Sequence, residues 1–323
     1  MRAVVVPEQG GPEVLDLVEL AEPSPGPGEV RVDVRAAGVN FLDVQQRSGT
    51  YRMRTPFTAG NEGAGVVSAV GPDVDGVAVG DRVAWAMISG GYAEQVVLPA
   101  DRLVPVPDDV DDETAAAVLL QGLTAHYLTR STYPVQAGDD VLLHAAAGGM
   151  GLLLTQLVTA AGGRLIGTAS TPEKAELALA AGADVMLPSD SPDLVDRVRE
   201  LTSGHGVAAV YDGVGRSTFD LSRRSLRRRG MLVLFGLASG SVPAFDPQIL
   251  ARNSLYLTRP GLLDYIAGRE ELLGRAAEVF DLVATGALSV RIGGRYPLAE
   301  AGIAHDDLAA RRTTGKLLIL PTD

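Results

Sequence analysis

Residues 139–161, DDVLLHAAAGGMGLLLTQLVTAA, are the stretch that decides the fold. The pattern predicts an apolar strand over Asp140–Ala146 that turns into an apolar helix over Gly149–Ala161. Within the turn, Ala146-x-Gly148-x-x-Gly151 is a dinucleotide-binding pattern with alanine in place of its first glycine. Such glycines let backbone N–H groups approach a pyrophosphate at the positive end of a helix. The pattern therefore predicts a nucleotide site, although an ordinary strand–helix turn also uses glycines.

Strands and helices alternate around this turn once the chain has passed Asp111. We expect strands at Arg164–Ala169, Val185–Leu187, Val207–Tyr211 and Met231–Phe235, and helices at Asp112–Leu128, Pro172–Ala181, Pro192–Thr202 and Arg216–Arg228. This alternation is typical of an α/β fold, in which helices cover both faces of a parallel sheet. Before residue 117, short alternating runs between Gly and Pro breaks predict antiparallel β structure, a barrel or a sandwich.

The end of the second strand indicates which nucleotide binds. NAD-binding chains place an acidic residue there to hold the ribose 2′-hydroxyl, whereas this strand ends in Gly167-Thr-Ala-Ser170. Thr171 and Pro172 then begin a helix that carries Lys174. Ser170, Thr171 and Lys174 offer hydrogen bonds and a positive charge to a 2′-phosphate. The segment predicts NADPH rather than NADH, and the alternative is that Lys174 is an ordinary solvated helix residue.

Two later strand ends also carry glycine-rich loops, Asp212-Gly-Val-Gly215 and Phe235-Gly-Leu-Ala-Ser-Gly240. Ligands of doubly wound sheets bind at the carboxyl ends of the strands. Both loops are therefore candidates for the nicotinamide half of the cofactor, and the alternative is simple turn chemistry.

The composition excludes several classes of site and partner. The 323 residues contain no cysteine, which removes disulfides, thiolate catalysis and cysteine-based metal sites. The formal charge of −12 disfavours nucleic acid as a partner. The basic stretch from Arg223 to Arg229 is expected on the solvated face of one helix. We find neither an apolar run of membrane length nor a secretory signal, and we expect a cytoplasmic protein that does not bind membranes.

Several motifs resemble the zinc-free NADPH:quinone oxidoreductase (zeta-crystallin-like) branch of the medium-chain dehydrogenase/reductases. They occur in family order as Gly38-Val-Asn-Phe-Leu-Asp43, Gly60-Asn-Glu-Gly-Ala-Gly65, Gln121-Gly-Leu-Thr124, His144-Ala-Ala-Ala-Gly-Gly-Met-Gly151 and Arg311-Arg-Thr-Thr-Gly-Lys316. The resemblance implies a GroES-like β-barrel catalytic domain from residues 1–118 and 260–323. It implies a Rossmann NADPH-binding domain, a doubly wound parallel sheet, at 119–259.

The same resemblance bears on metal binding. Zinc-dependent relatives carry Cys where this chain has Asn40 and His where it has Asn61, while Glu62 is kept. The structural-zinc lobe expected between Leu98 and Gln121 is missing with its cysteines. We therefore predict no metal site and no Lewis-acid mechanism.

Carried over to this sequence, the resemblance implies a set of cofactor-binding positions. They are Asn40, Gln121, Thr124, Ala147, Gly148, Gly149, Met150, Ser170, Lys174, Ser189, Val214, Phe235, Gly236, Leu237, Arg311 and Lys316. Three positions depart from the family, which has Lys at Gln121 and Tyr at Gln45 and Ser189. These changes put the strength of NADPH binding in question.

The predicted reaction is hydride transfer from NADPH to a quinone or related conjugated carbonyl such as an enone. A quinone accepts hydride without a metal, and the developing oxyanion needs only hydrogen-bond donors. Asn40 and Tyr51 are the candidates for that catalytic role, and the alternative for Tyr51 is a loop aromatic that packs on the barrel. Two other functions stay open: reduction of enoyl thioesters or alkenals, and a non-enzymatic role like that of lens zeta-crystallins. We also expect a homodimer, because Leu255–Thr258 is predicted as an unpaired edge strand.

Overall fold

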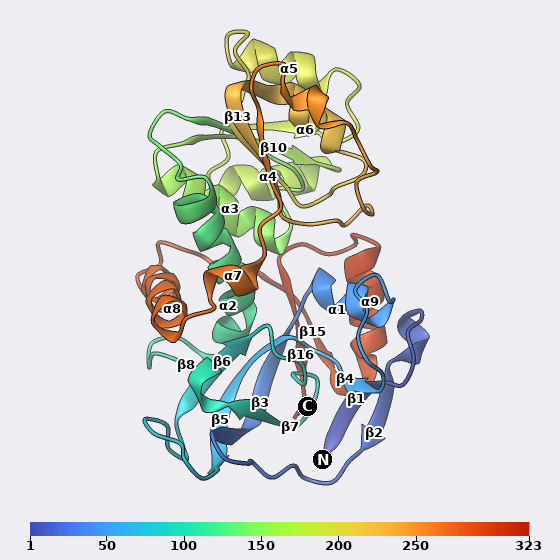
Figure 1. Ribbon diagram of the computed structural model, residues 1–323, viewed down its shortest axis with the longest axis vertical. Helices are drawn as coiled ribbons and strands as arrows, with labels where there is room; N and C mark the ends of the chain where they lie inside the picture. Colours follow the sequence, from blue (N-terminus) through green and yellow to red (C-terminus); the bar gives the residue numbers. More distant parts are fainter. Residues whose placement is uncertain (323) are drawn as a thin grey trace. The chain divides into compact units, whose positions relative to one another are not determined.

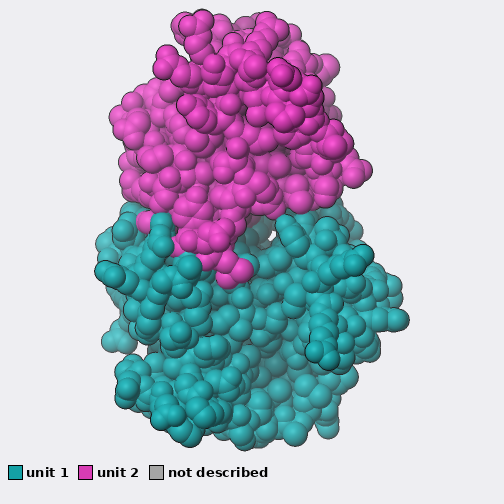
Figure 2. All heavy atoms as spheres, viewed as in Figure 1, with its two compact units in different colours: residues 1–123, 266–323 teal, residues 124–265 magenta. Residues whose placement is uncertain are grey.

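The computed structural model describes residues 1–322, which form two compact units (Figures 1 and 2). Unit 1 comprises Met1–Leu123 and the chain from Ile266 onward, and unit 2 comprises Thr124–Tyr265. The first boundary falls within helix α2 (Asp112–Tyr127). The predicted domain boundaries, after residue 118 and before residue 260, lie a few residues from these points.

Unit 1 is built on antiparallel strands. Its larger sheet has the order β15-β16-β3-β5-β6-β8, with β7 also paired to β3, and its smaller sheet has the order β2-β1-β4. The strands are β1 (Arg2–Val6), β2 (Asp16–Glu19), β3 (Glu29–Val39), β4 (Phe57–Thr58), β5 (Glu62–Val70), β6 (Arg82–Ala86), β7 (Gln95–Pro99), β8 (Val104–Pro105), β15 (Ile292–Pro297) and β16 (Lys316–Leu320). Only the pair β15–β16 is parallel among these described strands.

Alternation along β3 explains the core of unit 1. Val30, Val32 and Val34 point to one face and are at most 1 % exposed, where they join Trp85 and Leu98 in one apolar cluster. The helices of this unit are α1 (Phe41–Arg47), α8 (Arg269–Ala284) and α9 (Ala301–Ala309), with 3₁₀ turns at Pro12–Val14, Ala100–Arg102 and Leu298–Glu300.

Unit 2 holds a six-stranded, wholly parallel sheet in the order β11-β10-β9-β12-β13-β14. Its strands are β9 (Asp140–Leu143), β10 (Arg164–Ala169), β11 (Val185–Pro188), β12 (Val207–Asp212), β13 (Leu226–Leu234) and β14 (Tyr256–Thr258). Its helices are α3 (Gly149–Ala160), α4 (Pro172–Ala180), α5 (Leu194–Leu201), α6 (Phe219–Ser225) and α7 (Leu262–Tyr265), with a π-helical turn at Leu128–Thr132 and a 3₁₀ turn at Pro247–Leu250. Numbered within the unit, the strand order is 3-2-1-4-5-6, which is that of a dinucleotide-binding Rossmann sheet.

One prediction in unit 2 is wrong. The helix expected over Arg216–Arg228 ends at Ser225, and Arg227 to Arg229 lie in a bulge at the start of β13 rather than on a helix face. The cause is Leu226, which is fully buried and pairs with Val207, so the chain must leave the helix to place it in the core. Arg227 to Arg229 are exposed, as expected, but they belong to strand β13 and not to a helix.

Candidate functional site

The glycine turn after β9 has the geometry of a phosphate-binding loop. Ala145 adopts a left-handed conformation with φ of 55°, and the N–H of Gly148 donates back to its carbonyl at 3.0 Å. Helix α3 then begins at Gly149 with no side chain capping it. The amides of its first turn have no acceptor within the helix, so they suit an anion. The predicted residues Ala147, Gly148, Gly149 and Met150 are together on this turn.

Gly151 sets how closely α3 approaches the sheet. A Cβ at this position would lie 2.4 Å from the carbonyl oxygen of Ala145 and 2.5 Å from that of Ala146. These oxygens belong to the backbone and cannot swing away. Gly148 has more room, since the nearest atom to an added Cβ is 3.4 Å away. The turn therefore fits a dinucleotide pyrophosphate, with Gly151 required for packing.

The segment after β10 lies beside this turn at the carboxyl edge of the sheet. The N–H of Lys174 donates to the hydroxyl of Thr171 at 3.3 Å, which confirms Thr171 as the N-cap of α4. Ser170 and Thr171 are exposed, and the N–H of Ser189 donates to the carbonyl of Ala169 at 2.9 Å, which brings Ser189 to the same place. Glu173 is exposed too, and hydrogen bonds from its own N–H and from the Thr171 hydroxyl lower its pKa.

The loops after β12 and β13 are tied to each other by backbone hydrogen bonds. The N–H of Phe235 donates to the carbonyl of Asp212 at 2.9 Å, and the N–H of Ser239 donates to that of Val214 at 2.8 Å. A Cβ at Gly236 would lie 2.5 Å from the carbonyl oxygen of Gly213. The predicted residues Val214, Phe235, Gly236 and Leu237 are thus brought together, again at the carboxyl edge.

In unit 1, Asn40 lies in a buried polar cluster and is only 4 % exposed. Its Nδ2 donates to Oε2 of Glu62 at 2.9 Å, and its Oδ1 accepts from Nζ of Lys316 at 2.8 Å. Lys316 and Glu62 also form an ion pair whose side chains are 1 % and 0 % exposed. The other Glu62 oxygen accepts the N–H of Leu120 in α2 at 2.6 Å. Protein groups therefore hold the amide at both ends, and Lys316 reaches Asn40 and Glu62.

A second set of polar groups adjoins this cluster through Asp43. Its carboxylate accepts the N–H of Asn40 at 2.7 Å and Nδ2 of Asn61 at 2.6 Å. Burial raises the pKa of Asp43 to about 6, against the opposing effect of the hydrogen bond from Asn61. Asn61 Nδ2 donates to Oε1 of Gln46 as well, at 2.6 Å. The capping box formed by Asn40 and Asp43 at the start of α1 is the sequence signal that could have found Asp43.

The remaining predicted positions come from three other segments of the chain. Tyr51 follows α1 on a loop and is 39 % exposed, so its hydroxyl-bearing ring is at the surface of unit 1. Arg311 follows α9 with φ of 57° and is exposed. Gln121 and Thr124 are one turn apart on α2 and share a face of that helix.

The donor set at Asn40 and Asn61 does not fit a zinc ion. Two positions offer amides, and both oxygens of Glu62 already accept hydrogen bonds from groups that a metal would displace. Within residues 1–322, no group of three or more His, Cys, Asp or Glu side chains could hold a metal ion. The residues present thus leave no place for a metal at this cluster.

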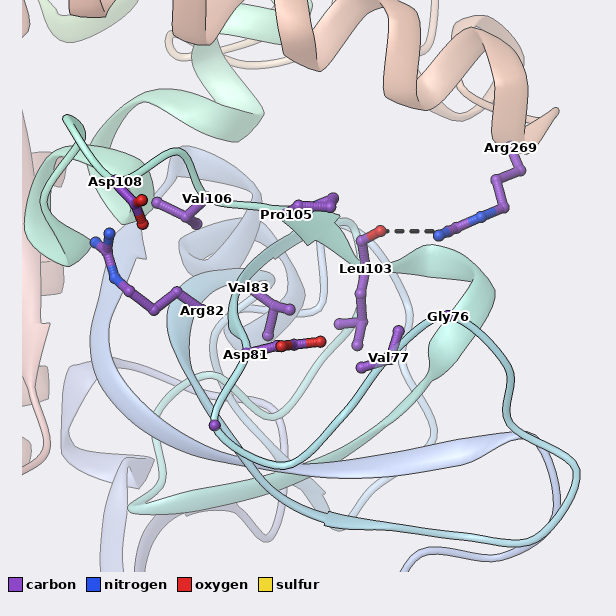
Figure 3. A pocket seen from close by; sticks show the side chains of 11 residues that line it. Gly76, Val77, Asp81, Arg82, Val83, Leu103, Pro105, Val106, Asp108 and Arg269 are labelled. Atoms are coloured by element: carbon purple, nitrogen blue, oxygen red, sulfur yellow. Dashed lines mark hydrogen bonds between the residues drawn. The ribbon is translucent and has the colours of Figure 1, made fainter.

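A cavity of about 420 Å³ in unit 1 contains none of the predicted site residues (Figure 3). Its charged lining residues hold the surrounding loops. Arg269 donates to the carbonyl of Leu103 at 3.2 Å, and Arg82 donates to Asp112 and to the carbonyl of Pro107. We assign no ligand to it.

Comparison with known proteins places this geometry in a family. The chain matches the alcohol dehydrogenase GroES-like domain over residues 26–108 and the zinc-binding dehydrogenase domain over 149–272. It is 47 % identical over 315 residues to a quinone oxidoreductase of Pseudomonas aeruginosa, covering 97 % of each protein. The chain belongs to the quinone oxidoreductase family. The predicted resemblance is confirmed, and so is the α/β fold with a GroES-like and a Rossmann part.

Two further similar proteins have a named ligand or a named substrate class. The crystal structure of Escherichia coli quinone oxidoreductase complexed with NADPH superposes with a TM-score of 0.97 at 42 % identity, covering 99 % of this chain and 100 % of that one. A 2-haloacrylate reductase of a Burkholderia species is 39 % identical and covers 99 % of this chain and 98 % of its own length. None of the helices within residues 1–322 has the length and apolar character to cross a membrane.

Proposed function

We propose that the protein is an NADPH-dependent quinone oxidoreductase that reduces a quinone or related conjugated carbonyl. The observation that carries this proposal is similarity over nearly the whole chain to quinone oxidoreductases, one of them complexed with NADPH. The glycine turn, whose first helical turn offers uncapped amides, supports the cofactor. When bound, NADPH supplies a hydride from C4 of its nicotinamide ring, and the quinone takes up that hydride and a proton to become a hydroquinone.

The residues of unit 2 divide into three roles. The amides of Gly149 and Met150 bind the pyrophosphate, which can approach closely because Gly148, whose own N–H donates to Ala145, has no side chain. Ser170 with Lys174 holds the 2′-phosphate. Val214 and the loop at Phe235–Leu237 hold the nicotinamide half at the carboxyl edge, where ligands of such sheets bind. Unit 2 is thus the nucleotide-binding domain in this proposal, with Ala147, Ser189 and Thr124 completing its set. Gln121 and Arg311, which belong to unit 1, are the other proposed cofactor contacts.

In unit 1, Asn40 and Tyr51 supply the hydrogen-bond donors for the oxygen that becomes negative as hydride arrives. The N–H that Asn40 offers is the one that makes only a long hydrogen bond of 3.4 Å, to the carbonyl of Gly38, since the other is held by Glu62. The amide of Asn40 has a fixed orientation, since Lys316 and Glu62 hold its two ends. A donor that is fixed before the reaction loses no reorganisation energy during it. Lys316 accordingly serves the reaction through Asn40, because its buried ammonium is engaged by Asn40 and Glu62.

An acceptor screen tests the function. NADPH oxidation is followed at steady state with 1,4-quinones, a crotonyl thioester and 2-chloroacrylate, each with NADH as the comparison. We expect turnover with quinones; turnover with the thioester alone would refute the proposal.

Lys174→Ala should weaken NADPH binding about tenfold and leave NADH binding unchanged, since it removes one charge–phosphate contact.

Reduction of an activated alkene is the second candidate, and the 2-haloacrylate reductase among the relatives favours it. Adding hydride to one alkene carbon requires a proton on the other, so this reaction depends on an acid near the substrate. Tyr51→Phe separates the candidates. It should abolish alkene reduction if Tyr51 is that acid, while quinone reduction falls only about tenfold for the loss of one donor.

We also propose a homodimer that forms through β14. This strand is last in the sheet and pairs with β13 on one side only among the described strands, and its Tyr256 is 56 % exposed. Such an edge presents backbone groups that a second copy can pair with by two-fold symmetry. Light scattering should give twice the chain mass, and a monomer would refute it.

The cytoplasm stays our predicted location, which cell fractionation tests.

A further inference from the structure

Five buried polar side chains form a chain of contacts beneath the carboxyl edge of unit 2. They are His144 after β9, Thr168 in β10, Asp212 at the end of β12, Thr218 before α6 and Ser222 in α6, and none is more than 9 % exposed. Most polar groups at such depth have hydrogen-bond partners, and each of these five contacts at least one of the others.

Counting donors, with His144 as a neutral imidazole, gives the direction of the bonds from Asp212 to Thr168. The carboxylate of Asp212 only accepts, so the hydroxyl of Ser222 donates its single proton to Oδ2 of Asp212 at 2.7 Å. Ser222 must then accept from Nε2 of His144 at 3.0 Å. In a neutral imidazole Nδ1 of His144 is then unprotonated, and it accepts from the hydroxyl of Thr168 at 3.2 Å. Thr168 in turn accepts the N–H of Ala145 at 3.3 Å.

The two ends of this chain lie on different loops of the predicted nucleotide site. One end holds Ala145, whose left-handed conformation shapes the glycine turn. At the other end, Oδ1 of Asp212 accepts the N–H groups of Val214 at 2.8 Å and Gly215 at 3.0 Å. The hydroxyl oxygen of Thr218 lies 2.8 Å from both carboxylate oxygens, which share its one proton. The glycine turn and the loop after β12 are therefore joined through His144.

We propose that His144, as its neutral Nε2–H tautomer, is a positioning residue that sets the glycine turn relative to the Val214–Gly215 loop for nucleotide binding. The proposal rests on the NADPH-dependent function proposed above. A neutral imidazole suits the task because it is rigid and offers one donor and one acceptor on opposite sides. An imidazolium would present two donors and leave the Thr168 proton without its acceptor. Burial also lowers the pKa of His144.

Nucleotide affinity tests the role, measured as the Kd for NADPH by fluorescence titration. His144→Leu and Ser222→Ala each break the chain and should raise Kd about tenfold or more. His144→Gln keeps one donor and one acceptor and should stay within about threefold of the wild type. Val198→Ala is the matched control. Val198 is fully buried in α5, belongs to the apolar core of the same unit, and takes no part in the hydrogen bonds that link Asp212 to Thr168.

The control separates positioning from general destabilisation. We expect Val198→Ala to lower Tm about as much as His144→Leu while leaving Kd unchanged. If both variants raise Kd equally, His144 is merely structural and the proposal is overturned. Absence of NADPH binding by the wild type would instead overturn the proposed function.

The tautomer gives a readout that is independent of affinity. Nitrogen-15 NMR of histidine-labelled protein at pH 7, with His144→Gln to assign the signal, should show Nε2 protonated and Nδ1 unprotonated. The opposite tautomer, or an imidazolium, would overturn the directed chain.

Discussion

The ion pair between Lys316 and Glu62 gives the sharpest prediction about stability. Both side chains are at most 1 % exposed, and Glu62 accepts only two further hydrogen bonds among those described, from Asn40 and Leu120. Lys316→Met keeps the apolar stem and removes the ammonium, leaving a buried carboxylate without its cation. Removing one partner of a buried pair costs about 3–5 kcal/mol. For a domain of this size that corresponds to a fall in Tm of roughly 10 °C.

Urea denaturation of wild type, Lys316→Met, Glu62→Gln and the double variant measures the coupling. In the double variant, the amide oxygen introduced by Glu62→Gln can still accept the N–H of Leu120 and no charge is buried. At least half of the stability lost in Lys316→Met should therefore return. The reasoning fails if Lys316→Met is within about 1 kcal/mol of the wild type. It also fails if the two single losses simply add in the double variant.

Burial of Asp43 raises its pKa to about 6, so folding favours the protonated carboxyl. The free energy of unfolding that this protonation contributes is fully present below the unfolded pKa near 4, and it is lost as the pH rises through 6. When the pH falls from 7 to 5, this group should raise the free energy of unfolding by about 1 kcal/mol, measured by urea denaturation. An equal rise in Asp43→Asn, which lacks the titrating carboxyl, would contradict this prediction. Gly38→Ala should destabilise by more than about 2 kcal/mol, because the new Cβ would lie 2.3 Å from Oε2 of Glu62. Gly274→Ala in α8 should stabilise the protein by about 0.5–1 kcal/mol, because an added Cβ there would have no atom within 4 Å. If calorimetry shows Tm moving in the same direction in Gly38→Ala and Gly274→Ala, the distinction between the two sites is refuted. Gly151→Ala should raise the Kd for NADPH about tenfold by pushing α3 from the sheet, and an unchanged Kd in fluorescence titration would argue against the glycine turn as the phosphate site.

The sheet of unit 2 could be predicted because its signals are local. The glycine pattern at 146–151 fixes one strand–helix turn, and strictly alternating elements leave a parallel sheet as the stable arrangement. The end of α6 could not be predicted in this way. A helix and the observed helix–strand junction both accept arginines on the surface, and only the pairing of Leu226 with Val207 decides between them. That pairing depends on residues in β12 that the local pattern does not include.

The polar clusters are harder to predict for the same reason. Asn40 and Lys316 are 276 residues apart in the chain, and their contact depends on the antiparallel pairing of β16 with β3. Lys316 looks in sequence like a surface lysine or a cofactor ligand, and only its burial shows that its charge is used inside the protein. His144 likewise follows an apolar strand, with nothing nearby to indicate that its partners come from β10 and α6.

Glu62, Lys316 and Gly38 depend on one another in the buried cluster that contains the amides at positions 40 and 61. The family resemblance implies that Asn40 and Asn61 stand where zinc-dependent relatives have metal ligands, and that Glu62 is a residue they share. With Asn40 and Asn61 in place of metal ligands, a buried Glu62 would have no cation, and an unpaired buried carboxylate is among the most costly features a core can have. The ammonium of Lys316 supplies that cation, and it fits only because residue 38 has no side chain, since an added Cβ would lie 2.6 Å from Cε of Lys316. In this chain the charge of Glu62 is therefore balanced by Lys316, and the same ammonium holds the amide of Asn40.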